Sequence, residues 1–392
     1  ATAPDGTVTL TITGLADGAD WPKHGVLAFA PVRLKDIQVT AGAELKPVVT
    51  DNFVLVSPEG KISKGGKVVI SYKGKPLVRP DAGRLKQISQ ARKIAADYPD
   101  GGAVLAALAL AEANRDSLLK ALAGAAKEVR PELSFLLTNM TPADLRTVSG
   151  ELLLENATLA HAARAKAPWG KDLSDELYYN DVLPFAILNE TRDSWRKLLM
   201  DKFAERAWKC KTPGEAALLL NRIVFEELKV SYHATKRPRP NQSPRESIDA
   251  NCASCTGLSI LLADACRACC IPARVAGIPS WKDGKGDGSG NHGGNHCWTE
   301  VWSEGDWHYL GASESKALDH AWFTAKVAGP AVDGATWQNS IFATSFRKTG
   351  MPFPMVWALD DVSVPAVNRT RWYKEHSKPE PEAKAETRPA GE

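Results

Sequence analysis

The chain lacks a long apolar run, a strong charge of either sign and an evident internal repeat. No stretch of about 18 consecutive apolar residues occurs among its 392 residues, so we expect no membrane span. Lysine and arginine number 49 against 46 aspartates and glutamates, which leaves a net charge of +3. This balance gives no reason to expect nucleic acid or an anionic membrane as a partner. The chain is 44% hydrophobic, which is enough to build large cores, and its length predicts about two or three domains.

Two further features are missing from the sequence. The first residue is alanine and not methionine, so we expect an exported protein, periplasmic or secreted, whose signal has been removed, with a cytoplasmic location as the alternative. The Gly-rich loop 283–294 lacks the spaced carboxylates of a calcium-binding loop, and its composition favours a mobile flap. We expect no cofactor and no metal.

Changes of pattern divide the chain. Residues 1–82 alternate polar and apolar side chains between turns, and this period of two predicts a small β-sandwich domain. Residues 83–200 are rich in alanine and leucine and predict a helical region. Residues 201–372 mix both patterns and form the third predicted domain. Residues 373–392 hold so few apolar side chains that we expect a disordered tail.

Two helix starts can be located from capping residues. Pro142 follows Thr141, and Pro213 follows Thr212 with an acidic residue at the third helical position. A hydroxyl before a proline is typical of a helix N-terminus, since proline lacks the N–H that would be unsatisfied there. We therefore predict helices that begin at these two prolines.

Six of the seven cysteines lie between residues 252 and 297, where a disulfide scaffold would spread them along the chain. Apolar residues at helical spacing follow Cys255, so this thiol stands at the N-terminus of a buried amphipathic helix. The helix dipole and the free N–H groups of the first turn stabilise an anion there, which favours a thiolate nucleophile. Cys266, Cys269 and Cys270 lie near the far end of the helix, and we expect them to pack in the core.

The spacing of Cys252, Cys255, Cys266 and Cys269 also has the outline of a four-cysteine zinc site. The residues between the two pairs predict one helix, which separates the pairs by about 15 Å at a rise of ~1.5 Å per residue and disfavours a shared ion. A redox pair of Cys252 and Cys255 is a second alternative.

A histidine begins a predicted strand after the helix. His296, Trp298 and Glu300 share one face of this strand. A histidine on a sheet against a cysteine at a helix N-terminus is the arrangement that cysteine acyl transfer requires, because the imidazole takes the thiol proton. His308, on the returning strand, and His292, in the Gly-rich loop, compete with His296 as this base.

These motifs resemble the transglutaminase-like superfamily. In that family a nucleophilic cysteine begins a helix, and an arginine and an I-P-A-R turn follow, as Cys255, Arg267 and residues 271–274 do here. The family's histidine strand, H-x-W-x-E-V, is matched by residues 296–301. The clear match runs over about residues 216–314, roughly a quarter of the chain.

The resemblance fails at one position. The family places an aspartate four residues after the tryptophan of the returning strand, and Gly311 stands there. If the hairpin has a three-residue loop, Glu314 faces His296, and if it has a two-residue loop, Ser313 does. We therefore predict Glu314 as the orienting acid, with Asp319 as the second choice and a Cys-His dyad as the alternative.

Other side chains are candidates for the oxyanion and substrate-binding roles. Gln242 precedes the cysteine, as a glutamine does in papain-like relatives, and the backbone N–H of Cys255 is a further oxyanion donor. His308 lies on the returning strand, near enough to bind substrate, and Trp298 shares the His296 face and is a second candidate. The alternative for the face that holds Trp298 and Glu300 is sheet packing with a buried ion pair to Arg274. Glu190 lies in a segment that resembles one found upstream of the core in some bacterial members.

The resemblance implies an α+β fold, in which a papain-like transglutaminase core follows the N-terminal β-sandwich and the helical region. It also implies acyl transfer at a carboxamide of a protein or peptide through a thioester on Cys255. Water as the acceptor makes the protein a peptidase or amidase, which we favour, and a lysine makes it a cross-linking transglutaminase. The alternative from another class is a catalytically inactive peptide-binding module.

Overall fold

The computed structural model describes residues 89–280, 294–324, 331 and 339–376 in full, and before residue 89 the backbone of six strands and of the start of a helix. It divides into two compact units, Ala1–Leu154 and Glu155–Glu392, and each is described by itself. Residues 283–293 of the predicted flap and the tail from residue 377 lie outside the described residues.

The first unit begins with two three-stranded antiparallel sheets, in the orders β1-β6-β3 and β2-β5-β4. The alternating polar and apolar runs of the sequence form these strands, as their period predicts. The side chains of both sheets lie outside the described residues, so their packing as a sandwich stays a prediction. The strands are β1 (Thr7–Thr13), β2 (Val26–Phe29), β3 (Lys35–Thr40), β4 (Leu45–Thr50), β5 (Phe53–Pro58) and β6 (Lys67–Lys73).

Short helices follow and bury their leucine and alanine faces against one another. The helix predicted at Pro142 is present, since the Thr141 hydroxyl accepts a hydrogen bond from the Asp144 N–H at 3.0 Å. The last helix of the series spans the boundary of the two units, so residues 155–200 belong to the second unit. The helices are α1 (Ala82–Ala95), α2 (Gly101–Leu110), α3 (Arg115–Gly124), α4 (Arg130–Asn139), α5 (Pro142–Thr147) and α6 (Gly150–Lys166).

The second unit is built on a five-stranded antiparallel sheet with the order β11-β10-β9-β12-β13. Every residue of its strand β9 is buried, as expected for a central strand that is covered on both faces. The strands are β9 (Ala273–Ile278), β10 (His296–Ser303), β11 (Asp306–Leu310), β12 (Phe342–Thr344) and β13 (Ala366–Asn368).

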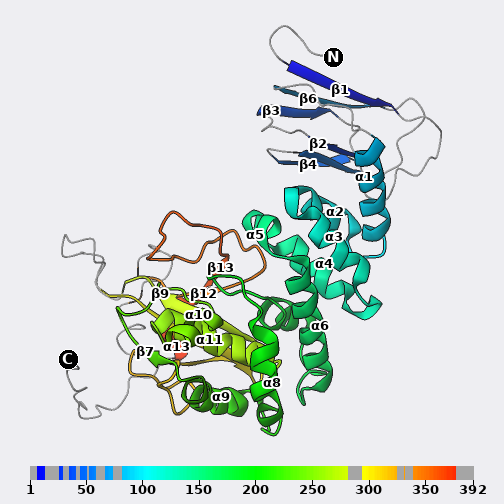
Figure 1. Cartoon of the computed structure of the whole chain (residues 1–392). Helices are drawn as coiled ribbons and strands as arrows, with labels where there is room; N and C mark the ends of the chain where they lie inside the picture. The colour runs from blue at the N-terminus through cyan, green and yellow to red at the C-terminus, as the bar shows by residue number, and fades with distance from the viewer. Residues whose placement is uncertain are drawn as a thin grey trace. The chain divides into compact units, whose positions relative to one another are not determined.

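The helix α11 (Cys255–Ala268) packs against β9 and β10, with α8 and α9 beside it (Figure 1). One helix therefore spans the residues between the two cysteine pairs, as predicted. Helix α9 begins at Pro213, where the Thr212 hydroxyl accepts the Glu215 N–H at 3.2 Å. The remaining elements are α7 (Asp175–Leu177), a π-helical turn (Tyr178–Val182), α8 (Trp195–Ala207), α9 (Pro213–Leu228), β7 (Ser231–Tyr232), α10 (Pro244–Ala250), β8 (Cys252–Ala253) and α13 (Thr370–His376).

An aromatic cluster covers the face of the sheet that is turned away from α11. Trp298 stacks on Phe323 with 4.9 Å between ring centroids, and its indole N–H donates to the Tyr373 hydroxyl at 2.6 Å. Tyr373 lies in α13, which runs to His376. The prediction that the tail is disordered from residue 373 is therefore wrong for its first four residues, because this buried aromatic side chain anchors them.

The hairpin of β10 and β11 has a two-residue loop. Ser303 pairs with Asp306, which leaves Glu304 and Gly305 as the loop. Both have positive φ angles, +50° and +94°, as the type I′ turn of a two-residue hairpin requires. The three-residue loop on which the assignment of Glu314 rests is therefore wrong, and extension of the register places Ser313 across from His296.

Candidate active site

Cys255 is the first residue of α11 and is partly exposed. Ser254 caps the helix and accepts the N–H of Gly257. Burial raises the pKa of the Cys255 thiol, while hydrogen bonds from the backbone N–H of Cys297 and from the hydroxyl and N–H of Thr256 oppose this rise. The thiol is thus held in its neutral form in the resting protein, although it is surrounded by donors that favour an anion. The sequence alone predicts the donors but not the larger effect of burial.

His296 is the first residue of β10, and its side chain is only 7% exposed. Three aromatic rings surround the imidazole, with centroid distances of 4.7 Å to Phe323, 5.2 Å to Trp322 and 6.0 Å to Trp298. Burial lowers the pKa of His296 to about 4, so the imidazole is neutral at pH 7 and can accept a proton. The N–H that reaches the Cys255 sulfur belongs to the residue that follows His296, so the structure brings the two motifs together.

The two candidate acids have other partners. Asp319 binds His308, with 2.6 Å between Oδ2 and Nδ1, and accepts the N–H of Tyr309 at 3.0 Å. Glu314 is exposed and accepts the indole N–H of Trp322 at 2.5 Å. Because the Trp322 ring packs against the imidazole of His296, Glu314 is connected to His296 through this indole.

Arg267 fixes α11 to the turn that follows it. Its guanidinium is buried and donates to the carbonyl oxygens of Ala273, at 2.8 Å, and Ala186, at 2.9 Å. A second buried cation, Arg196, donates to the carbonyl of Arg267 at 2.9 Å. These bonds satisfy backbone acceptors that would otherwise be buried without partners, and they set the position of the helix that carries Cys255.

Residues 201–312 match the model of the transglutaminase-like superfamily. The chain carries a transglutaminase-like core. No curated protein matches the chain. Among solved structures, it is similar to a candidate cysteine protease from Cytophaga hutchinsonii, with 10% identity over 78% of this chain and 75% of that one and a TM-score of 0.23.

Trp298, predicted as a substrate-binding residue, is instead part of the interior of the transglutaminase-like core. Its side chain is 0% exposed, so substrate does not reach it. Glu300, on the same strand face, forms a buried ion pair with Arg274 at 2.7 Å and a second with Arg369 at 3.0 Å. The alternative interpretation of this face, sheet packing with a buried ion pair, is the one that the structure supports.

Gln242 is buried, and its amide nitrogen donates to the carbonyls of Glu246, at 3.2 Å, and Cys252, at 3.0 Å. Both N–H groups of the amide are thus engaged. The geometry gives no support to Gln242 as an oxyanion donor. It instead fixes the chain between α10 and the strand that leads to Cys255.

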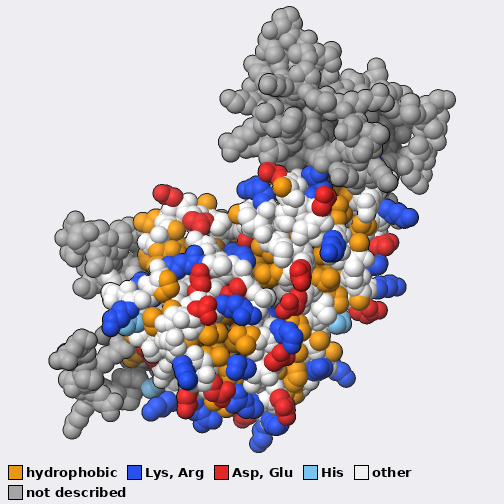
Figure 2. Space-filling model, in the orientation of Figure 1, with side chains coloured by type: hydrophobic (Ala, Val, Ile, Leu, Met, Phe, Trp, Pro, Cys, Tyr) orange, Lys and Arg blue, Asp and Glu red, His pale blue; other side chains and the backbone are white. Residues whose placement is uncertain are grey.

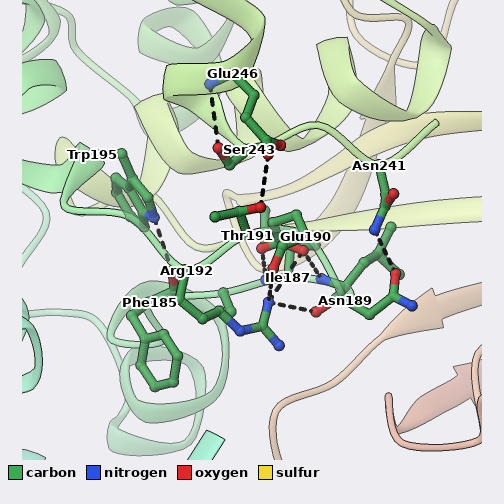
Figure 3. A network of polar contacts seen from close by, with 12 residues as sticks. Phe185, Ile187, Asn189, Glu190, Thr191, Arg192, Trp195, Asn241, Ser243 and Glu246 are labelled. Atoms are coloured by element: carbon green, nitrogen blue, oxygen red, sulfur yellow. Dashed lines mark hydrogen bonds and ion pairs between the residues drawn. The ribbon is translucent and has the colours of Figure 1, made fainter. Parts of the chain in front are cut away.

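Glu190 organises its own loop and is buried (Figure 3). Its carboxylate accepts the N–H groups of Ile187 and Leu188, both at 2.8 Å, and lies 3.5 Å from the Arg192 guanidinium. The same loop reaches α10, where the Thr191 hydroxyl donates to a carboxylate oxygen of Glu246 at 2.7 Å. Its prediction as a substrate-binding residue finds no support, because these partners occupy both oxygens. The segment supports the approach to Cys255 instead.

A groove of about 860 Å³ lies between α9, β7 and the turn 313–316. The sequence does not reveal this groove, because its walls come from segments that are far apart in the chain. Strand β7 pairs with β8, which leads directly into Cys255. The groove is lined by Glu215, Leu218, Leu219, Asn221, Arg222, Phe225, Glu226, Val230, Ser231, Tyr232, Ser313, Glu314, Ser315 and Lys316.

Two further features of the described residues are the length and polarity of their helices and the charge of the visible surface. None of the helices among the described residues has the length and apolar character that crossing a membrane requires. Figure 2 shows basic and acidic side chains interspersed over the visible face of these residues.

Proposed function

We propose that the transglutaminase-like core catalyses acyl transfer from a carboxamide through a thioester on Cys255, with water as the usual acceptor. The protein is then a peptidase or amidase. The observation that carries this proposal is the contact of the Cys255 sulfur with the N–H of the residue after His296, which brings the start of the strand that carries the neutral base to the nucleophile at a helix N-terminus.

The pKa directions favour a neutral pair over a preformed ion pair. Burial raises the pKa of Cys255 and lowers that of His296 to about 4, so both groups are uncharged at pH 7. His296 then acts as a general base during attack: it takes the thiol proton while the sulfur bonds to the carbonyl carbon. The backbone N–H of Cys255, at the start of α11, donates to the oxyanion that forms.

The intermediate then collapses. The carbon–nitrogen bond breaks, and the proton held by His296 passes to the departing amine, which leaves a thioester on Cys255. Water attacks this thioester and gives a proton to His296. When the carbon–sulfur bond breaks, the proton returns to the sulfur and a carboxylic acid leaves. An amine in place of water would give a new amide, which is the cross-linking alternative.

The groove beside β7 supports a polypeptide as the substrate. Apolar side chains such as Leu218 and Phe225 line it together with acidic and basic ones, a mixture that suits a peptide with varied side chains. Tyr232 is 45% exposed on β7 and lies in the groove lining, where it offers an aromatic surface for contact.

The proposal is tested with p-nitrophenyl acetate as an activated acyl donor. We expect one acetyl group on Cys255, identified by intact mass and peptide mapping, together with release of p-nitrophenolate. His296→Ala should slow acylation by about 10²-fold or more, as expected for loss of a general base, whereas the control His308→Ala should keep the wild-type rate. Hydrolysis of the acetyl-enzyme, compared with its capture by added amines, then distinguishes water from lysine as the acceptor.

The inactive peptide-binding module remains the second candidate, and one observation favours it. Gly311 stands where the family has its aspartate, and neither Glu314 nor Asp319 occupies that place. If Cys255 is acetylated no faster than the other cysteines, catalysis is refuted and this second candidate is to be pursued.

A further inference from the structure

Trp322 lies at the edge of the candidate active site and takes no part in the acyl-transfer steps. Its ring centroid is 5.2 Å from that of His296, with 50° between the two ring planes. The side chain is 45% exposed, so burial alone does not hold the indole against the imidazole. A further contact is needed to explain why this ring stays beside the base.

The carboxylate of Glu314 makes that contact. Its Oε2 accepts the indole N–H of Trp322 at 2.5 Å, and a hydrogen bond to a carboxylate is about twice as strong as one between neutral groups. The same oxygen lies over Gly311, since a β-carbon there would be 3.2 Å from Oε2 and 3.4 Å from the ring of Phe323. The glycine thus leaves the space that the carboxylate uses, next to a second ring that packs on His296, at 4.7 Å.

The turn that carries Glu314 is itself fixed. The Asn221 side chain accepts the N–H of Ser313 at 2.7 Å and donates to the Ser315 carbonyl at 3.0 Å. The Ser315 hydroxyl donates to the carbonyl of His320 at 3.1 Å, which ties the turn to the segment that leads into the tryptophan. Because the carboxylate and the indole come from segments that are bonded to each other, the bond between them defines where the indole ring lies.

A ring held in this way has two effects on the base. Strand β10 places the backbone of His296, and the indole limits the directions in which the imidazole can turn. Proton transfer needs the imidazole nitrogen within hydrogen-bond reach of the thiol, so a ring that cannot turn away favours it. The imidazole also becomes a cation when it takes the proton, and a cation within about 6 Å of an aromatic centroid is attracted to the ring.

We propose that Trp322, held by Glu314, is a positioning residue that sets the orientation of the His296 ring and stabilises the imidazolium formed during acyl transfer. The inference rests on the proposed function, in which His296 is the base. Glu314 then acts on the base through an indole. Both Trp322 and Glu314 lie beyond residues 201–312, which match the family model, so this role is specific to the segment that follows the matched core.

The test measures the rate at which iodoacetamide alkylates Cys255 in the full chain at pH 7, by peptide mapping. Alkylation requires the thiolate, so its rate reports how readily the base takes the proton. We expect Glu314→Ala to be about tenfold slower, as for one lost hydrogen bond to a charged group. Glu314→Gln keeps an oxygen that can accept the indole N–H and should restore most of the rate. Glu226→Ala is the matched control, since it removes another exposed glutamate of the groove, and it should keep the wild-type rate.

A double-mutant cycle separates positioning from a general loss of structure. In the His296→Ala background, Glu314→Ala should slow alkylation no further, whereas damage to the fold would slow it in both backgrounds. Trp322→Phe keeps an aromatic ring without the N–H, so it should slow alkylation as Glu314→Ala does, and the two changes together should do no more than either alone.

A wild-type rate in both Glu314→Ala and Trp322→Phe would overturn the inference, and so would an equal slowing with and without His296. Failure of the wild type to form the acetyl-enzyme refutes the proposed function instead, since alkylation does not depend on acyl transfer.

Discussion

Removal of the charge of Glu300 should destabilise the second unit more than most single substitutions. The side chain is 0% exposed. Its carboxylate binds Arg274 and Arg369 and accepts the Tyr373 hydroxyl at 2.9 Å. Glu300→Gln keeps the shape and leaves two largely buried guanidiniums without a counter-charge. Breaking a buried ion pair in this way costs about 3–5 kcal/mol, which lowers the melting temperature on the order of 10 °C for a unit of this size.

The pH dependence of stability is a second, independent test of the role of Glu300. Burial alone would raise the pKa of Glu300, but the guanidiniums of Arg274 and Arg369 lower it below its usual value. A depressed folded pKa contributes stability that is complete above the unfolded carboxyl pKa of about 4.3 and is lost as the pH falls through the folded pKa. The difference between wild type and Glu300→Gln should therefore be full at neutral pH and shrink in acid.

Urea unfolding followed by tryptophan fluorescence measures both effects. The exposed Glu226, changed to glutamine, is the control and should stay within about 0.5 kcal/mol of the wild type. Arg369→Met in the Glu300→Gln background should recover part of the loss, because it removes one of the two uncompensated charges. A cost below about 1 kcal/mol for Glu300→Gln at pH 7 would refute the argument that this carboxylate is indispensable to the two cations.

Two further predictions concern α9 and the groove beside it. Thr212→Ala removes the cap that accepts the Glu215 N–H and should cost about 1 kcal/mol in urea unfolding, whereas Thr212→Ser should cost little. Asn221→Ala removes three hydrogen bonds to the backbone of the turn 311–315, at 2.7 to 3.1 Å. We expect a loss of about 2–3 kcal/mol and weaker peptide binding in the groove, and unchanged peptide affinity would contradict the role of this turn as a groove wall.

The local parts of the structure could be predicted from the sequence because short-range chemistry decides them. Thr141 and Thr212 cap the helices that begin at the following prolines. The apolar spacing after Cys255 forms one helix, and the alternation after His296 forms one strand. Residues 201–312 match the family that these motifs indicate.

What depended on long-range packing could not be predicted. The length of the hairpin loop follows from the positive φ angles of Glu304 and Gly305. Glutamate rarely adopts a positive φ, so the sequence does not mark Glu304 as a residue of a two-residue loop. The indole of Trp298 bonds to Tyr373, which lies far away in the chain, and the carboxylate of Glu190 bonds to backbone N–H groups. The sequence shows neither partner, so it does not distinguish a packing role from a binding role for these two side chains. The packing of α11 against β10 depends on the register of helix against strand, for which periodicity gives the direction of the side chains but not the phase.

The positions of the nucleophile and the base do not depend on the strand that follows the two-residue hairpin loop. The pairing of β10 with β9 and its packing on α11 fix His296 and Cys255, and neither contact involves β11. Insertion or deletion in the loop at Glu304 would therefore exchange the side chains presented after β11 and leave the nucleophile and base in place. Such length changes are a direct route to new acids or new groove walls in this scaffold.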